Sequence, residues 1–152
     1  MIVEVEGVDA GLRDVEHFIS TWTLGDRYDR FGTTSESAAR WLIEQLGDPA
    51  HQGLIARTSG EVIALLDFVH TAWTVEFGLF VEKSRRRGGV GRELLRHLLR
   101  QLPIAEIVVG HCRFQNRAAM AFLSACAFTM EYEGGGDCRW SLPIVASSAP
   151  DG

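Results

Sequence analysis

The sequence lacks the features that would place it in several large classes of protein. It has no apolar run approaching the roughly 18 residues that a membrane span requires. Its N-terminus alternates apolar and acidic residues and does not resemble a signal peptide. The three cysteines are an odd number without the paired spacing of a zinc site, so we expect reduced thiols and no metal. These absences predict a cytoplasmic protein without a membrane partner.

The chain also lacks the positive charge of a typical nucleic-acid-binding protein. It has 20 acidic and 15 basic residues and a net charge of −5, which argues against a nucleic-acid partner. Nearly half of the basic residues lie between Lys83 and Arg100. An acidic protein with one basic segment suits a polyanionic cofactor and a cationic acceptor. For Arg96 and Arg100, a merely solvated helix face is the simpler interpretation.

The apolar periodicity predicts one α/β domain over residues 1–143. The 152 residues are enough for one core, and residues 144–152, rich in Ala, Ser and Pro, are expected to form a flexible tail. The element order is that of a mixed central β-sheet flanked by helices. The expected strands are 1–7, 53–58, 61–69, 74–81, 104–110, 128–133 and 139–142, and the expected helices are 10–22, 33–46, 89–102 and 116–125.

Local signals set some of the expected boundaries. Asp9 is a candidate cap for the first helix, and Thr33 with Glu36 forms a capping-box pattern for the second. Within that second helix, Trp41 is expected to face inward together with leucines. Residues 24–32 read as a turn-rich link between the two helices.

The most informative segment is the glycine-rich stretch RRGGVG at residues 86–91. It lies between the apolar strand 74–81 and the amphipathic helix 89–102. Glycines permit a tight turn and close approach of a ligand, and the free amides at the start of a helix attract anions. The alternative is a solvated basic turn in which the glycines only punctuate a loop. In context, the segment predicts a phosphate-binding site.

Two common phosphate-binding loops do not match. A Walker loop requires Lys followed by Ser or Thr after its last glycine, whereas Gly91 precedes Arg92 and Glu93. A dinucleotide fingerprint requires a third small residue, but Leu94 stands there, and Glu106 precedes an apolar run instead of ending one. A third pattern, Arg/Gln-x-x-Gly-x-Gly/Ala, is matched by residues 86–91.

With the preceding strand VEFGLFV at 75–81, this pattern resembles the acetyl-CoA-binding segment of GCN5-related N-acetyltransferases, the GNAT family. A second segment, NRAAMAFL at 116–123 followed by Ala127-Phe128, is similar to the family's Asn-x-x-Ala helix and its Gly-Phe ending. The resemblance covers residues 50–143 well and implies a GNAT-like fold. It also implies an N-acetyltransferase that moves an acetyl group from acetyl-CoA to a primary amine, either a small molecule or a protein lysine or N-terminus.

The resemblance also implies which residues hold the cofactor. The backbone of Leu79, Phe80 and Val81 would pair with pantetheine where two strands separate. The pyrophosphate would take contacts from the turn and the helix start, which comprise Arg86, Arg87, Gly88, Gly89, Val90, Gly91 and Arg92. Asn116 would either contact the cofactor or only cap its helix, and the two interpretations have equal weight.

An amine acceptor must lose a proton before it attacks, and the resemblance implies that Glu76 is the catalytic base, because a carboxylate of the family often serves so at this place in the strand, five residues before Val81. The alternative is an outward-facing glutamate in an alternating strand. The family tyrosine that protonates the departing thiolate is replaced by Leu123, which cannot donate a proton, and Ala127 replaces the final glycine. Residues 26–31 faintly resemble the start of bacterial protein-lysine acetyltransferase domains, which would put Asp26 and Asp29 on the acceptor side. A polar link between helices is the simpler interpretation.

The missing tyrosine leaves a second function open, a catalytically inactive acyl-CoA-binding sensor or regulatory domain. A third possibility is a partner-binding domain that keeps only the fold. The sequence does not identify the acceptor amine, because acceptor loops vary within one fold. The expected assembly is a monomer or a homodimer.

Overall fold

The computed structural model describes residues 3–102 and 106–144, and these residues form one α/β domain around a seven-stranded sheet. The strand order is β1-β2-β3-β4-β5-β7-β6, and every neighbouring pair is antiparallel except β4 with β5. The strands are β1 (Glu4–Gly7), β2 (His51–Thr58), β3 (Glu61–His70), β4 (Thr74–Val81), β5 (Ile107–Arg113), β6 (Thr129–Gly134) and β7 (Asp137–Pro143). The predicted mixed sheet is confirmed.

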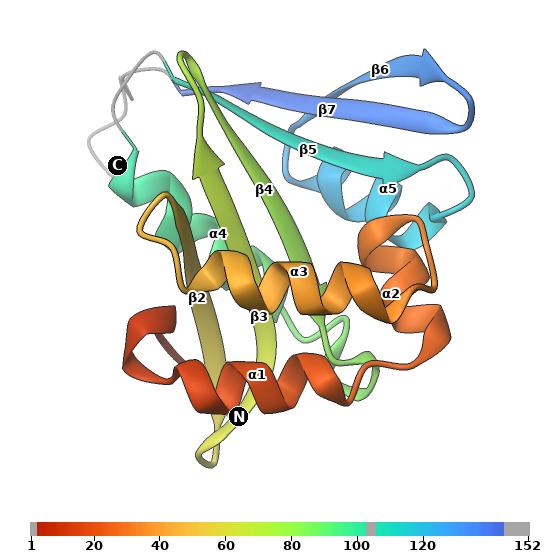
Figure 1. The fold of residues 1–152 in the computed structure, drawn as a ribbon. Helices are drawn as coiled ribbons and strands as arrows, with labels where there is room; N and C mark the ends of the chain where they lie inside the picture. The colour runs from red at the N-terminus through yellow and green to blue at the C-terminus, as the bar shows by residue number, and fades with distance from the viewer. Residues whose placement is uncertain (1–2, 103–105, 145–152) are drawn as a thin grey trace.

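Helices cover both faces of this sheet, as Figure 1 shows. We call the face under the first three helices the front face and the face under the other two the back face. The front helices are α1 (Leu12–Ser20), α2 (Leu24–Phe31) and α3 (Glu36–Leu46), and the back helices are α4 (Val90–Gln101) and α5 (Arg117–Ala125). Short 3-10 turns occupy η1 (Val8–Ala10) and η2 (Lys83–Arg85). None of the helices described is long and apolar enough to cross a membrane.

Alternation along the strands divides the core into two clusters, one on each face of the sheet. On the back face, Leu94 and Leu98 of α4 are fully buried against the sheet, together with Val75 and Val108. On the front face, α1 and α3 bury residues such as Ile19 against β2, β3 and Phe80 of β4. Successive residues of β4 and β5 therefore point to opposite sides, and the side of each candidate residue can be read from its position.

β4 and β5 lie side by side only at their starts. Their register runs from Thr74–Ile107 to Phe77–Gly110 and then ends, although both strands continue. β4 stays paired with β3 as far as Val81. Figure 1 shows the two strands fanning apart toward α2 and α5. The sheet consequently opens between two of its central strands.

The N-terminal third departs from several expectations. Residues 24–31 form helix α2 instead of a link, and the capping box belongs to this helix, where Thr23 and Asp26 exchange hydrogen bonds. Helix α3 is capped by Ser35, not Thr33, and Trp41 is 49% exposed instead of facing inward. The first long helix is preceded by Gly11, because Asp9 lies in η1. The predicted tail, residues 144–152, lies outside the described residues except for Ile144.

Candidate active site

The free edge of β4 is the first component of the candidate site. The amide of Glu82 donates to the carbonyl of Ile63 on β3, so even-numbered residues of β4 direct their backbone groups toward β3. Leu79 and Val81 therefore direct theirs toward the opening, where β5 has already diverged. An extended ligand could add here like a further strand.

The glycine-rich turn is the second component, and it follows β4 directly. Gly89 is the residue before α4 and has a φ of 83°, a left-handed conformation that favours glycine. A Cβ built on Gly89 meets no atom within 4 Å, so this position borders open space. Arg87, also at positive φ (69°), is exposed beside it.

The first turn of α4 has no side-chain cap. The same holds for α1, whereas α2, α3 and α5 are each capped by a side chain, from Thr23, Ser35 and Asn116 respectively. Unsatisfied amides at the positive end of a helix dipole form an anion site when basic side chains surround them. The start of α4 therefore has the donors that a pyrophosphate needs.

The lack of a side chain at Gly91 is required by packing. A Cβ on it would lie 3.2 Å from Leu79 Cδ2 and 3.3 Å from Phe122 Cε1. The lack of a side chain therefore lets α4 begin close to both β4 and α5. Val90 is almost fully buried, which fixes the helix start against the back-face core.

The Arg86 side chain contacts neighbouring protein groups. Its Nε donates to the carbonyl of Val81 at 2.9 Å, its guanidinium lies 5.4 Å from the centre of the Phe80 ring, and its Nη1 is 4.0 Å from Asp29 Oδ2. The side chain thus joins the end of β4 to α2. Arg87 and Arg92, both exposed, are the basic residues of this turn with side chains facing solvent.

Helix α5, which contains the Asn-x-x-Ala pattern, lies at the back of the opening. The Oδ1 of Asn116 accepts from the amide of Ala119 at 3.1 Å, so this side chain caps α5. Leu123 is 5% exposed, and a Cβ on Gly110 would lie 3.8 Å from its Cδ2. Leu123 is therefore next to the last paired residue of β5, at the point where the strands separate.

Glu76 lies on the front face at the same level. Val75 belongs to the back-face cluster and Phe80 to the front-face cluster, so alternation puts Glu76 on the front. It pairs with Val109 of β5, one position before the opening, and its side chain is exposed. Among the described residues its carboxylate has no hydrogen-bond or ion-pair partner, so it remains accessible to a cation.

Sequence reasoning missed the buried ion network that holds α2 against the opening. Asp67 of β3 is 3% exposed, and its carboxylate oxygens lie 2.6 Å from Arg30 Nη2 and 2.8 Å from His51 Nε2. The Arg30 guanidinium covers Gly78, where any Cβ would lie 2.2 Å from it. An aspartate within the apolar strand 61–69 and a glycine within 74–81 were the available signals.

The charges in this network determine its electrostatics. Burial alone raises the pKa of Asp67, but the Arg30 charge and hydrogen bonds from His51 and Arg30 outweigh it, so the pKa lies below its usual value. The carboxylate is therefore ionised and paired. This pairing keeps α2 beside the residue that follows the last β4–β5 pair.

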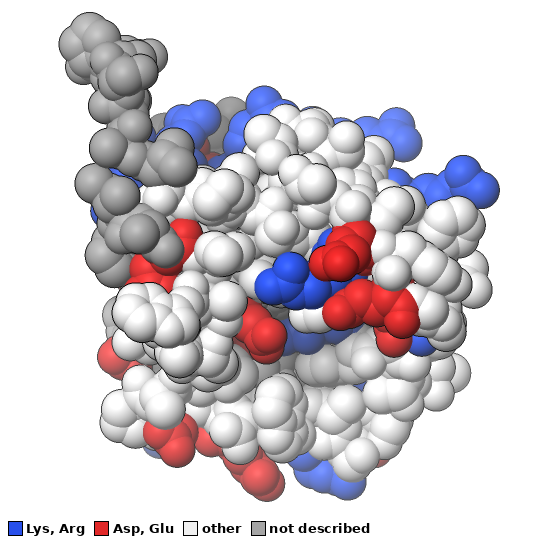
Figure 2. All heavy atoms as spheres, turned by 90° about the horizontal axis from the view of Figure 1, so that it is seen from above, with Lys and Arg blue, Asp and Glu red and all other residues white. Residues whose placement is uncertain are grey.

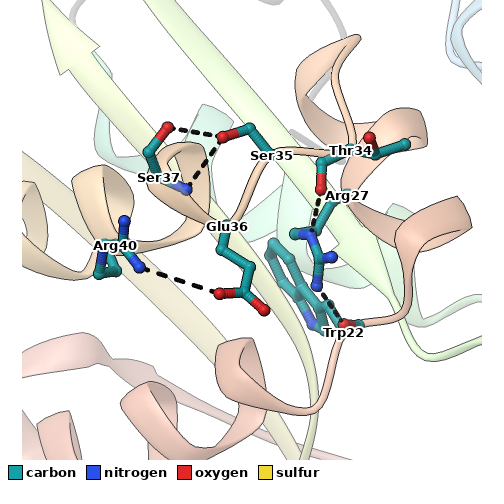
Figure 3. Close-up of polar contacts among 7 residues, drawn as sticks. All are labelled: Trp22, Arg27, Thr34, Ser35, Glu36, Ser37 and Arg40. Carbon is teal, nitrogen blue, oxygen red and sulfur yellow. Dashed lines mark hydrogen bonds and ion pairs between the residues drawn. The ribbon is translucent and has the colours of Figure 1, made fainter.

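Arg27 fixes the ends of α2 (Figure 3). Its Nη1 donates to the carbonyl of Trp22 at 2.9 Å and its Nε to the carbonyl of Thr34 at 2.8 Å. One side chain thus joins the segments that enter and leave the helix.

A cleft of about 820 Å³ lies beside α2, and Asp26, Asp29 and Arg86 are among its lining residues. Asp26 and Asp29 therefore face this cleft, and Asp29 lies near Arg86.

The comparisons with known proteins agree with this architecture. The model of the acetyltransferase (GNAT) family matches residues 16–128. The chain is similar in structure to the GNAT domain of S. lividans PAT, with a TM-score of 0.73, 17% identity and coverage of 93% of this chain and 89% of the other. No curated protein sequence matches it.

Two further solved structures share the fold. The ribosomal-protein-S18-alanine N-acetyltransferase from Escherichia coli has a TM-score of 0.71 and 16% identity, with 98% of each chain covered. The Campylobacter jejuni N-acetyltransferase PseH in complex with acetyl coenzyme A has a TM-score of 0.67 and 15% identity, with 93% of this chain and 99% of the other covered.

Proposed function

This chain belongs to the acetyltransferase (GNAT) family, and from that premise we propose that it is an acetyl-CoA-dependent N-acetyltransferase. The acetyl group would pass to a primary amine of a small molecule, a protein lysine or an N-terminus by direct attack on the thioester. The observation that carries the proposal is the opening between β4 and β5, which leads to a helix start without a side-chain cap. No described group of three His, Cys, Asp or Glu residues is arranged to hold a metal ion.

The proposed cofactor path follows the back of the opening. Pantetheine would pair with the backbone of β4 through Leu79, Phe80 and Val81, of which the first and last direct their amides into the opening. The pyrophosphate would take the amides from Gly88 to Arg92, with Arg87 and Arg92 contributing charge.

Arg86 would stabilise this path indirectly, by holding the end of β4 against α2. Asn116 caps α5 with its oxygen, and its amide nitrogen would contact the cofactor. We therefore propose that both residues belong to the cofactor site. Arg86 would act chiefly by positioning the end of β4.

On the front face, Glu76 would bind the ammonium form of the acceptor and take its first proton. Its exposure and lack of a described partner suit both tasks. The neutral amine then attacks the thioester carbon, a C–N bond forms, and the C–S bond breaks to release CoA.

Calorimetry and turnover test this proposal together. Acetyl-CoA at about 100 times its dissociation constant should stabilise the fold by roughly 2.7 kcal/mol. A panel of polyamines, amino acids and lysine-containing or free-N-terminus peptides should contain at least one acceptor that releases CoA. No binding at millimolar acetyl-CoA would overturn the cofactor site.

Leu123 favours a second candidate, an acyl-CoA-binding sensor without catalysis, because leucine cannot protonate a thiolate. Tight cofactor binding without turnover for any amine would support the sensor. Turnover with one amine of the panel would exclude it.

A further inference from the structure

We propose that His111, oriented by Glu133, carries the proton from the attacking amine to the departing sulfur. This proposal rests on the proposed acetyl transfer. It addresses the protonation of the departing thiolate, which Leu123 cannot perform. It starts from a histidine that is not used in the cofactor path or in the role given to Glu76.

The register places His111 at the mouth of the opening. Gly110 is the last residue of β5 paired with β4, and His111 is the next one. Val108 and Cys112 belong to the back-face core, so His111 points to the front, on the same face as Glu76. Its side chain is 47% exposed, which leaves it accessible to an acceptor.

Glu133 is the carboxylate that would orient the imidazole. Its Oε1 lies 3.4 Å from His111 Nδ1. Glu133 lies at an irregularity of β6, where the register with β7 shifts between Tyr132 and Gly134. Bulges of this kind redirect a side chain, and here the carboxylate reaches toward a residue two strands away. A carboxylate at Nδ1 holds the hydrogen there and leaves Nε2 free to accept a proton.

The surroundings of His111 carry charges of both signs. They come from every neighbouring element of the front face: Glu76 on β4, Arg139 and Asp137 on β7, Glu131 and Glu133 on β6, Arg113 on β5 and Arg30 on α2. Arg113 is paired with Asp137 and Arg30 with Asp67, so both of these cations are compensated. Figure 2, which looks down on the molecule, shows a compact group of acidic and basic side chains on this side, with further charged side chains scattered around it.

The proposed step conserves atoms and charge. After Glu76 has taken the first proton to solvent, the neutral amine attacks and gives a tetrahedral intermediate with a positively charged nitrogen. His111 Nε2 takes a proton from that nitrogen, the carbonyl re-forms, the C–S bond breaks, and His111 returns the proton to sulfur. The products are the amide and CoA thiol, with one net proton released. A single imidazole can serve as base and then acid in this way.

His111→Ala tests the proposal, and His70→Ala is its matched control. His70 is 46% exposed and lies 3.8 Å from Glu106, so it also forms a histidine–glutamate pair, but at the opposite end of the β4 pairing. We expect kcat to fall about 10² to 10⁴-fold in His111→Ala and to stay unchanged in His70→Ala. The dissociation constant for acetyl-CoA should be unchanged in both.

Chemical rescue separates proton transfer from a structural role. Added imidazole should restore part of the turnover of His111→Ala and leave His70→Ala unaffected. Glu133→Gln should lower kcat less than His111→Ala does. An unchanged kcat in His111→Ala, or a fall that imidazole does not relieve, would overturn the proposal while the acetyltransferase function stands. Absence of turnover in the parent protein would overturn both.

Discussion

The two sides of the β4–β5 opening are built in different ways. The back is made from one continuous stretch, β4, the glycine-rich turn and α4, with α5 beside it. The front is assembled from α2, β3, β4, β5 and the β6–β7 hairpin, which are far apart in the chain. A contiguous stretch can be recognised from sequence patterns, whereas an assembled surface cannot.

Gly89→Glu should have the largest effect. It should weaken acetyl-CoA binding on the back side and leave the front side unchanged. A side chain and a negative charge would both enter the open space at the helix start, where the left-handed φ of 83° already disfavours other residues. We expect acetyl-CoA affinity to fall by about 10²-fold or more, equivalent to roughly 2.7 kcal/mol. Calorimetry measures the affinity, and thermal unfolding confirms that the variant is folded.

Gly89→Asn is the matched control, because asparagine tolerates the left-handed conformation and adds no charge. It should keep most of the affinity. If Gly89→Glu binds acetyl-CoA as tightly as the parent, the phosphate site is elsewhere.

Glu76→Gln should affect the front side alone. Turnover should fall by about 10² to 10⁴-fold because the amide cannot take the acceptor's proton. Acetyl-CoA affinity should barely change, since the carboxylate lies on the face opposite the cofactor path. Steady-state kinetics with a genuine acceptor measures the loss, and Glu4→Gln on the distant edge strand β1 is the control. A parent-like rate would refute Glu76 as the base.

Arg30→Met should show how strongly the stability of the front side depends on the buried ion pair of Arg30 and Asp67. Removing Arg30 leaves the buried Asp67 carboxylate with His51 as its remaining partner, which should lower the free energy of unfolding by up to about 3–5 kcal/mol. The double variant Arg30→Met/Asp67→Leu should lose less, because both charges are gone. Urea denaturation measures the difference, and a loss below about 1 kcal/mol in the single variant would disprove this dependence.

The same network predicts how stability depends on pH. The folded-state pKa of Asp67 is lowered from 3.8, so its contribution is fully present above that value. It is lost as the pH falls below 3.8 through the folded-state pKa. The parent should therefore lose more stability in this acid range than Asp67→Asn, and parallel pH curves would contradict the assignment.

Leu123→Tyr should have the smallest effect on turnover. It tests the point where the two sides of the opening meet. A hydroxyl behind Gly110 would offer a second proton donor, so turnover should rise by less than about tenfold if proton delivery to sulfur limits the rate. Leu123→Phe supplies similar bulk without the hydroxyl and controls for overpacking at this buried position. Equal turnover in the two variants would show that the hydroxyl does not reach the sulfur.

The sequence predicted the back side well for a physical reason. A strand, a glycine-rich turn and an amphipathic helix are specified by local alternation, positive φ and helical periodicity, and these signals lie within residues 74–102. The structure confirms the strand and the helix, with an uncapped helix start between them. The assigned roles of the site residues stay predictions.

The N-terminal third was harder to predict because its local signals compete. Thr23–Asp26 and Thr33–Glu36 both have the spacing of a capping box, and only the first forms one. Gly25 and Gly32 suggested a link, yet Gly32 ends α2 with a φ of 72°. Helix α2, which includes Gly25, has few apolar residues and no buried side chain, so the sequence gives little sign of a helix that packs on a core.

The sequence by itself determined the family, the order of most elements and the position of the glycine-rich turn, since each depends on neighbouring residues. Only the tertiary structure decided which strands separate, that Arg30 and His51 both bind Asp67, that Arg30 covers Gly78, and that Glu133 reaches His111. The two Asp67 contacts join residues 37 and 16 positions apart, and Glu133 reaches His111 across the intervening strand β7. Their geometry comes from sheet register and helix packing, which no local pattern encodes.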